Sequence, residues 1–264
     1  MKHLIWIASL CLLIAGSYLC SLKNHTAEIA GFHPARNDSL AKTFAPGLRA
    51  GEYGIPERLL YRMSEASDGS IHIAYFFVWP YERNDSPGIM PWLSRTLYTD
   101  GLSLQGILFG PGDVEVIYLV LERNSGGPAD GYRIKSMEFE TAGDYDPRDF
   151  GVSHLPVQYT FPLESASDLR AAHGPNSDFL SFPGSRHLIF RVISWNHMFE
   201  WEPASRAGAE ETVSLRPEYF SEEDWNHFGM FKPVESIVSR NRAHPEFARE
   251  AVPISIAPKP GVKK

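Results

Sequence analysis

Two long apolar runs dominate the pattern of hydrophobic and polar positions along this chain. Residues 71–79 are apolar on both strand faces apart from His72, and residues 112–121 continue as apolar sequence after Asp113 and Glu115. Their β-branched and aromatic residues favour strands over buried helices. Both runs therefore predict central strands of a sheet that is covered on both of its faces.

A third strong apolar run, residues 186–195, predicts another strand that leads into the aromatic segment 196–202. Weaker signals predict further elements: a strand at 59–63, a hairpin strand at 132–140, short helices at 168–173 and 234–242, and a helix that Ser221 and Asp224 open as a capping box. Together the pattern predicts a mainly β protein. We expect a single β-sandwich-like domain with a few short peripheral helices towards the C-terminus.

The pattern also divides the chain. Residues 1–22 read as a signal peptide or signal anchor, residues 23–42 as a linker, residues 43–250 as the β-rich domain and residues 251–264 as a disordered tail. The first segment is long enough to cross a bilayer of about 30 Å if it is not cleaved. Small residues at 15–17 suit cleavage, and lipidation of Cys20 is a third, minor alternative. In each case the domain is expected outside the cytoplasm, as a secreted, periplasmic or membrane-anchored protein.

The net charge and the positions of the cysteines limit the functions that this chain can have. The net charge of −7 and the lack of a long basic stripe exclude a nucleic-acid binder, because nothing would neutralise a run of phosphates. Both cysteines, Cys11 and Cys20, lie in the N-terminal apolar segment. The predicted domain therefore has no disulfide, no catalytic cysteine and no thiolate metal site.

Candidate chemistry begins with Asp113 and Glu115, which leave the same face of a strand because they are two residues apart. Two neighbouring carboxylates repel unless a cation or several donors compensate. A hard cation, Ca²⁺ or Mg²⁺, would suit the pair. The alternative is a solvated strand end that is acidic without a function.

The third strand supplies possible polar partners for these carboxylates. His187 and His197 are ten residues apart, so on a continuous strand they share a face with Arg191. Trp195 and Glu200 complete the predicted ligand-binding set, which is His187, Arg191, Trp195 and Glu200. The alternative is that one histidine is a satisfied core or strand-end residue and the other lies in a loop.

Taken in order, three motifs resemble those of the necrosis-inducing (necrosis- and ethylene-inducing-like) proteins and the related vacuolar-sorting-like domains. Residues 75–82, Tyr-Phe-Phe-Val-Trp-Pro-Tyr-Glu, are similar to the family's aromatic strand and the turn that follows it. Residues 112–115, Gly-Asp-Val-Glu, match the end of its Gly-His-Arg-His-Asp-Trp-Glu segment, and residues 187–197 match a later strand with a histidine at each end. The resemblance spans about residues 44–200.

The resemblance implies a β-sandwich with a divalent cation at one end, and the toxins of the family bind sphingolipid headgroups on membranes. Carried over to this chain, the cation ligands would be Glu82, Asp113 and Glu115. Gly110 and Gly112 stand where the family motif has its histidines, so His197 or a loop water would have to replace the missing ligand.

These observations lead to three hypotheses. The first is an exported or membrane-anchored binding module for a surface glycan or lipid headgroup, dependent on Ca²⁺ or Mg²⁺ if the cation site is intact. The second is a hydrolase of envelope or extracellular polymers, in which Glu82, Asp113 or Glu115 acts as acid or base near His197. The third is a structural envelope protein with no catalytic site.

Overall fold

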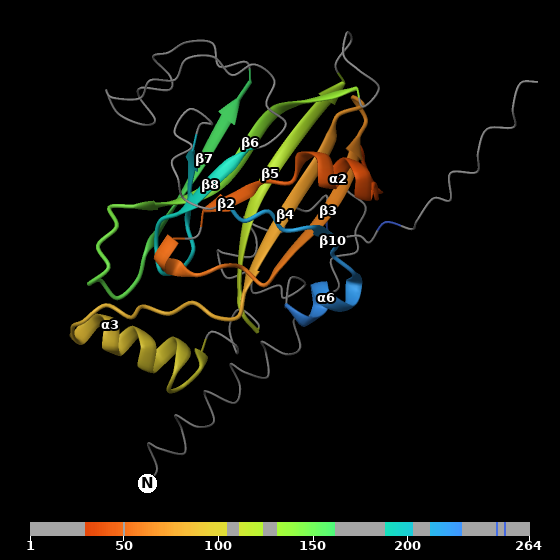
Figure 1. The fold of residues 1–264 in the computed structure, drawn as a ribbon. Coiled ribbons are helices and arrows are strands. Elements are labelled where there is room, and N and C mark those ends of the chain that lie inside the picture. Colours follow the sequence, from red (N-terminus) through yellow and green to blue (C-terminus); the bar gives the residue numbers. More distant parts are fainter. Residues whose placement is uncertain are drawn as a thin grey trace, which may run out of the picture.

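The computed structural model describes residues 30–49, 51–104, 111–123, 131–161, 188–202, 212–228, 247 and 251. Within these residues the strands form a large sheet and a small sheet that pack face to face (Figure 1). The large sheet has the order β1 (Phe32–Ala35), β3 (Arg58–Ala66), β4 (Ile71–Trp79), β5 (Asp113–Arg123), β6 (Tyr132–Gly143) and β7 (Ser153–Thr160), with β10 (Pro217–Tyr219) also paired to β3. The small sheet has the order β2 (Gly47–Arg49), β8 (Ile189–Val192) and β9 (Phe199–Glu202). The prediction of a mainly β, sandwich-like domain is confirmed.

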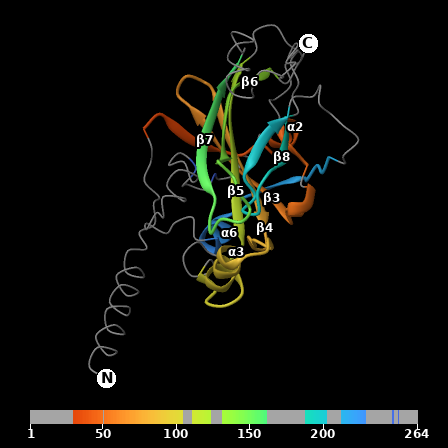
Figure 2. The same ribbon diagram turned by 90° about the vertical axis from the view of Figure 1, so that its left-hand side faces the viewer.

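The helical elements are short and lie at the periphery. They are α2 (Asp38–Phe44), the 3₁₀-helix η1 (Gly51–Tyr53), α3 (Ile89–Ser94), the π-helix η2 (Arg95–Thr99) and α6 (Glu222–His227). Figures 1 and 2 both place α3 beyond the ends of the long strands. The capping residue predicted for α6 is confirmed, because the Ser221 hydroxyl accepts a hydrogen bond from the Asp224 N–H at 3.1 Å.

The two predicted central strands are β4 and β5, and they are antiparallel neighbours. Their register pairs Ile71 with Leu121 at one end and Trp79 with Asp113 at the other. β4 is buried along almost its whole length because the sheet is covered on both faces. The predicted hairpin is also present, since β6 pairs with β5.

One face of the large sheet packs against the small sheet and forms the main core. Side chains that alternate along the strands, such as Tyr75 and Phe77 of β4, meet Phe190 and Phe199 of the small sheet. On the opposite face, Phe76 contacts the rings of Phe220 and Trp225, and a second hydrophobic cluster forms there. Successive side chains of β4 therefore contribute alternately to two separate hydrophobic cores.

The folded domain begins earlier than predicted. The segment expected to be a linker, residues 23–42, contains β1 and most of α2. β1 pairs with β3, and Asn37 caps α2 by accepting the Leu40 N–H at 3.0 Å. Leu40 and Phe44 are then buried in the main core, which the polar sequence around them did not reveal.

The third predicted strand is shorter than expected. β8 ends at Val192, a turn follows, and β9 begins at Phe199. The strands β7, β9 and β10 and the helix α3 were not predicted. The predicted N-terminal segment 1–22, the helices at 168–173 and 234–242 and nearly all of the tail 251–264 lie outside the described residues. Among the residues that are described, no helix is long and apolar enough to span a membrane.

Candidate functional site

Asp113 and His197 form a buried carboxylate–imidazole pair at one end of the sandwich. Asp113 is the first residue of β5, and its Oδ2 lies 2.7 Å from Nδ1 of His197 in the β8–β9 turn. The side chains are only 9% and 5% exposed. The sequence prediction that His197 meets the carboxylates of a neighbouring strand is therefore met for Asp113, across 84 residues of sequence.

Trp79 fixes the plane of the His197 imidazole. The two rings stack with centroids 4.3 Å apart and an interplanar angle of 8°. Trp79 is the cross-strand partner of Asp113, so β4 supplies the stacking surface and β5 the carboxylate. The Trp79 indole N–H in turn approaches the Gly54 carbonyl oxygen at 3.5 Å. The imidazole is held in both position and orientation.

His197 also has an unusual backbone conformation. Its φ of +60° lies in the left-handed region of backbone conformation, which residues other than glycine rarely adopt. The turn is closed by hydrogen bonds from the His197 N–H to the Ser194 carbonyl oxygen and from the Ile193 N–H to the Met198 carbonyl oxygen, both at 2.9 Å. Strained residues that the surroundings fix in place are concentrated at functional sites, which makes His197 the leading candidate in this end of the molecule.

A series of side-chain hydrogen bonds connects the β8–β9 turn to the β6–β7 hairpin. The Met198 N–H donates to the Ser194 hydroxyl at 3.1 Å, and that hydroxyl donates to Oδ1 of Asn196 at 2.6 Å. The Asn196 side-chain amide then donates to Nε2 of His154 at 3.2 Å, and Nδ1 of His154 lies 2.8 Å from Glu140. This places a second carboxylate–imidazole pair, Glu140 and His154, beside the first.

The second pair comes from the β6–β7 hairpin. Glu140 is 17% and His154 32% exposed, so this pair is more open to solvent than the pair of Asp113 and His197. Sequence reasoning missed both residues. The register of β6 and β7 brings them together, and β7 gave no clear strand signal because its residues are mostly exposed and include Pro156.

The conformation of Gly112 determines how the chain enters this site. Gly112 has a φ of +96°, and a Cβ atom added there would lie 2.6 Å from the Trp79 carbonyl oxygen. No side chain fits without displacing the end of β4. The necrosis-inducing proteins have a histidine at the corresponding position of their motif. A histidine side chain is incompatible with the backbone of this chain at residue 112.

A contact between two tyrosines links two loops at this end of the sandwich. The Tyr53 and Tyr145 hydroxyls lie 3.3 Å apart, linking η1 to the β6–β7 loop. Burial is the main reason that the pKa of Tyr53 lies well above its usual range, and the hydrogen bond with the Tyr145 hydroxyl raises it further. In the same loop, hydrogen bonds from Arg148 lower the pKa of Asp146 to about 2.

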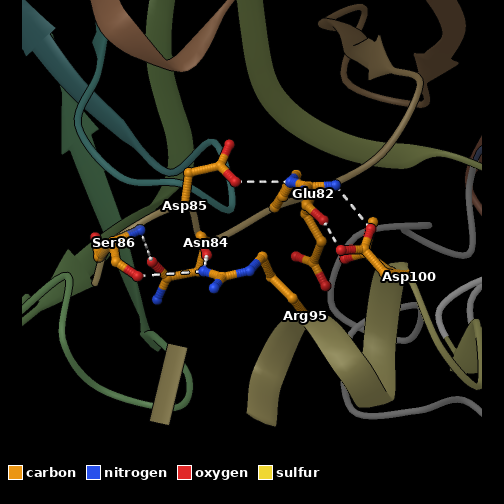
Figure 3. A network of polar contacts seen from close by, with 8 residues as sticks. Glu82, Asn84, Asp85, Ser86, Arg95 and Asp100 are labelled. Carbon is orange, nitrogen blue, oxygen red and sulfur yellow. Dashed lines mark hydrogen bonds and ion pairs between the residues drawn. The ribbon is translucent and has the colours of Figure 1, made fainter. Parts of the chain in front are cut away.

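The predicted cation ligands do not gather at one point. Glu115 is buried on the same strand face as Asp113, as predicted. Glu82 lies in the loop after β4, where its carbonyl oxygen accepts the Thr99 hydroxyl at 2.8 Å, within the polar network of Figure 3. Among the described residues, no group of three or more His, Cys, Asp or Glu side chains is arranged to hold a metal ion.

The predicted ligand-binding set is not brought together either. Arg191 alternates with the buried residues Phe190 and Val192, so it faces away from the main core and pairs with Glu200 on the outer face of the small sheet. Trp195 is buried in the β8–β9 turn. His187 lies outside the described residues. The expectation of one continuous strand from 187 to 197 was wrong because the chain turns after Val192, which separates Arg191 from His197.

The arrangement defines the chemistry of His197. A carboxylate only accepts hydrogen bonds, so Asp113 places the imidazole proton on Nδ1 and leaves the lone pair of the neutral ring on Nε2. Nε2 has no hydrogen-bond partner among the described residues. An imidazole of this kind can accept a hydrogen bond from a hydroxyl group, bind a cation or take up a proton.

Comparison with known proteins gave no match to a protein-family model, to a curated protein or to a solved structure. The resemblance to the necrosis-inducing proteins therefore stays a prediction. The site is defined by its own geometry, with Asp113, His197 and Trp79 at its centre.

Proposed function

We propose that this protein is an extracytoplasmic binding module that recognises a polar surface group, a glycan or a lipid headgroup, at the end of the sandwich that carries His197. The observation that supports this proposal most is the 2.7 Å contact between Asp113 and His197 on the face of Trp79. It holds one imidazole nitrogen in a fixed position and in a defined protonation pattern. Hydroxyl groups of a sugar or headgroup are natural donors to such a nitrogen.

The proposal includes a role for a divalent cation. Asp113 and Glu115 share one strand face, and Ca²⁺ or Mg²⁺ held by their oxygens could bridge to an anionic or hydroxylated ligand. Calorimetric titration of each ion into the full-length protein tests this part. Heat of binding, or a rise in melting temperature that Asp113→Asn abolishes, supports a cation; no heat and no shift remove it.

Ligand binding itself is tested with an immobilised glycan panel and with vesicles that carry different headgroups. His197→Gln and Asp113→Asn should each weaken binding by about 3-fold to 10-fold, the loss expected for one hydrogen bond between neutral groups. The matched control is His72→Gln. His72 also contacts an oxygen, the Tyr118 hydroxyl, but lies at the opposite end of β4. Equal losses in all three variants would contradict the proposed site.

A second function deserves a test because the same pair matches a general base. A carboxylate that orients an imidazole, with Nε2 directed to a substrate, is a recurrent arrangement in hydrolases. Glycan and phosphoester substrates should be screened with the parent protein and with Asp113→Asn. Turnover that falls by about 100-fold in the variant would favour a hydrolase, and equal turnover would remove these residues from any catalytic role.

A further inference from the structure

The helical segment 89–99, formed by α3 and η2, is attached to the domain by polar groups (Figure 3). The Arg95 guanidinium donates to the carbonyl oxygens of Asn84 and Ser86. Asp100, just after η2, pairs with Arg83 at 2.7 Å. Together with the Thr99 hydroxyl on the Glu82 carbonyl oxygen, these contacts fix the segment at the end of β4.

Three large apolar side chains at the start of the segment are exposed to solvent. Ile89 is 79%, Met90 49% and Trp92 56% exposed, whereas Pro91 and Ser94 are buried. Ile89 and Trp92 are three residues apart, so they share one side of the helix. An ordinary surface helix of a soluble protein turns its apolar side inward and its polar side to water. The first turn of this segment instead exposes Ile89, Met90 and Trp92, although Pro91 is buried and Leu93 is half-buried.

The segment belongs to a wider apolar surface at the same end of the molecule. The exposed large hydrophobic residues among the described part of the chain are Ile55, Tyr81, Ile89, Met90, Trp92, Leu102 and Leu155. Ile55 precedes Glu57, whose N–H bonds the Val78 carbonyl oxygen, and Leu155 pairs with Thr141 near the β6–β7 turn. All seven therefore lie in or beside the connections at the end of the sheet where β4 ends and β5 begins. The opposite end has none among the described residues.

The character of this surface fits a lipid bilayer. It consists of separate loop and helix tips that carry Trp and Tyr together with aliphatic side chains, the composition of membrane–water interfaces. The segment 81–100 holds two arginines and three acidic residues, and Arg83 is already paired with Asp85 and Asp100. With a charge of 2 − 3 = −1 there, the surface suits zwitterionic lipid better than anionic lipid.

The chain before the domain is long enough for this orientation. The nine residues from Lys23 to Gly31 reach about 30 Å when extended, and β4, also of nine residues, spans about 30 Å. Gly31 lies beside Ser67 at the far end of the sheet. If the apolar segment 4–22 lies in a bilayer, as its sequence predicts, that bilayer is within reach of α3.

We propose that α3 and η2 form a docking element that inserts Ile89, Met90 and Trp92 into the interface of a zwitterionic bilayer. The proposal concerns how the domain lies on a membrane. It stands apart from what binds beside His197, because none of these residues contributes to that pair.

The test uses the full chain with Cys11→Ser and Cys20→Ser, reconstituted into phosphatidylcholine vesicles. Met90→Cys in this background carries a nitrobenzoxadiazole fluorophore, and the matched control carries it on Glu65→Cys, since Glu65 is exposed at the opposite end of β3. A quencher attached to lipid chains should quench the label at 90 at least threefold more than the label at 65. Ile89→Ser with Trp92→Ser should remove that difference without changing the melting temperature, because both side chains are exposed.

Three outcomes would overturn the proposal. Equal quenching at both positions would show that the α3 end does not touch lipid. Protection of the label at 90 from aqueous iodide before lipid is added would indicate that another copy of the chain covers it. Insertion that requires anionic lipid would contradict the charge argument. Loss of glycan or headgroup binding in His197→Gln, with quenching unchanged, would leave the docking element intact.

Discussion

A Cβ atom at Gly112 would lie 2.6 Å from the carbonyl oxygen of Trp79, and the φ of Gly112 is +96°. β5 therefore begins at a point where no side chain is tolerated. We expect Gly112→Ala to lower the free energy of unfolding by about 2 kcal/mol or more, since strain and a backbone clash add. Urea denaturation measures the change.

Gly69→Ala is the matched control for this prediction. Gly69 has a φ of +80°, but a Cβ atom there would meet nothing within 4 Å. Its substitution should cost only the conformational strain, about 1 kcal/mol. If the two variants lose the same stability, the close approach to Trp79 has no energetic importance.

Arg62 should be essential to the second hydrophobic cluster. It is 1% exposed, donates to the carbonyl oxygens of Phe220 at 3.0 Å and Phe247 at 2.6 Å, and lies 3.9 Å from the centroid of the Trp225 ring. Arg62→Met keeps the packing volume but leaves these carbonyl groups without the guanidinium. We expect a loss of about 3 kcal/mol in thermal or chemical unfolding.

The exposed Arg216 provides the comparison for Arg62. Arg216→Met should change stability by no more than about 0.5 kcal/mol. A similar small effect for Arg62→Met would mean that the buried guanidinium does not hold residues 220 and 247 against the sheet.

The pair of Arg58 and Asp224 should make stability depend on pH. Both guanidinium nitrogens Nη1 and Nη2 lie 3.1 Å from the carboxylate oxygens, and this hydrogen bonding lowers the pKa of Asp224. The stabilisation is present above the ordinary aspartate pKa of about 3.9 and is lost as the pH falls through the lower value of the folded state.

Comparison with Asp224→Asn isolates this contribution. At about pH 6.5 the parent protein should be more stable by roughly 0.5–1 kcal/mol, the range for a partly exposed ion pair. The difference should shrink as urea titrations are repeated at successively lower pH below 3.9. A difference that grows on acidification would contradict the assignment.

Asn84 should join the β4–α3 loop to the β6–β7 loop. It is 1% exposed, and its amide donates to the carbonyl oxygens of Pro147 at 2.9 Å and Asp149 at 3.2 Å. Asn84→Ala leaves two carbonyl groups without this donor. We expect faster hydrogen exchange in residues 144–150, whereas Asn226→Ala on the exposed side of α6 should leave that exchange unchanged.

The strongest elements of the fold were predictable because their sequence signal is local. β4 and β5 are buried on both faces, so their residues form unbroken apolar runs whatever they pack against. β1 and α2 were missed for the opposite reason. Their residues are mixed in polarity, and only pairing with β3 and burial of Leu40 and Phe44 make them part of the domain.

α3 was not recognised because of the prolines in and before it and because three of its large apolar residues are exposed. Pro87, Gly88 and Pro91 indicate a loop, but Pro91 lies in the first turn of the helix, where its missing N–H costs little. Ile89, Met90 and Trp92 then face water, so the pattern that normally reveals a surface helix is missing.

Half of the central site was predictable. Asp113, Glu115 and His197 were singled out from spacing and residue type, and the structure joins Asp113 to His197. Glu140 and His154 were not found, because a hairpin register and a single amide of Asn196 bring them to the site. The left-handed turn at His197 also left no sequence signal, because the residue pattern predicted a strand as far as Trp195, whereas β8 ends at Val192.

The edge of β3 carries a consequence for the order in which the molecule assembles. β1 occupies one half of this edge and β10 the other, although they are separated by more than 180 residues of sequence. A chain that ends before residue 217 leaves Leu59–Tyr61 without a neighbour on that side. Synthesis must therefore pass Tyr219 before the sheet can close, and a shorter nascent or truncated chain presents an open strand edge to other chains.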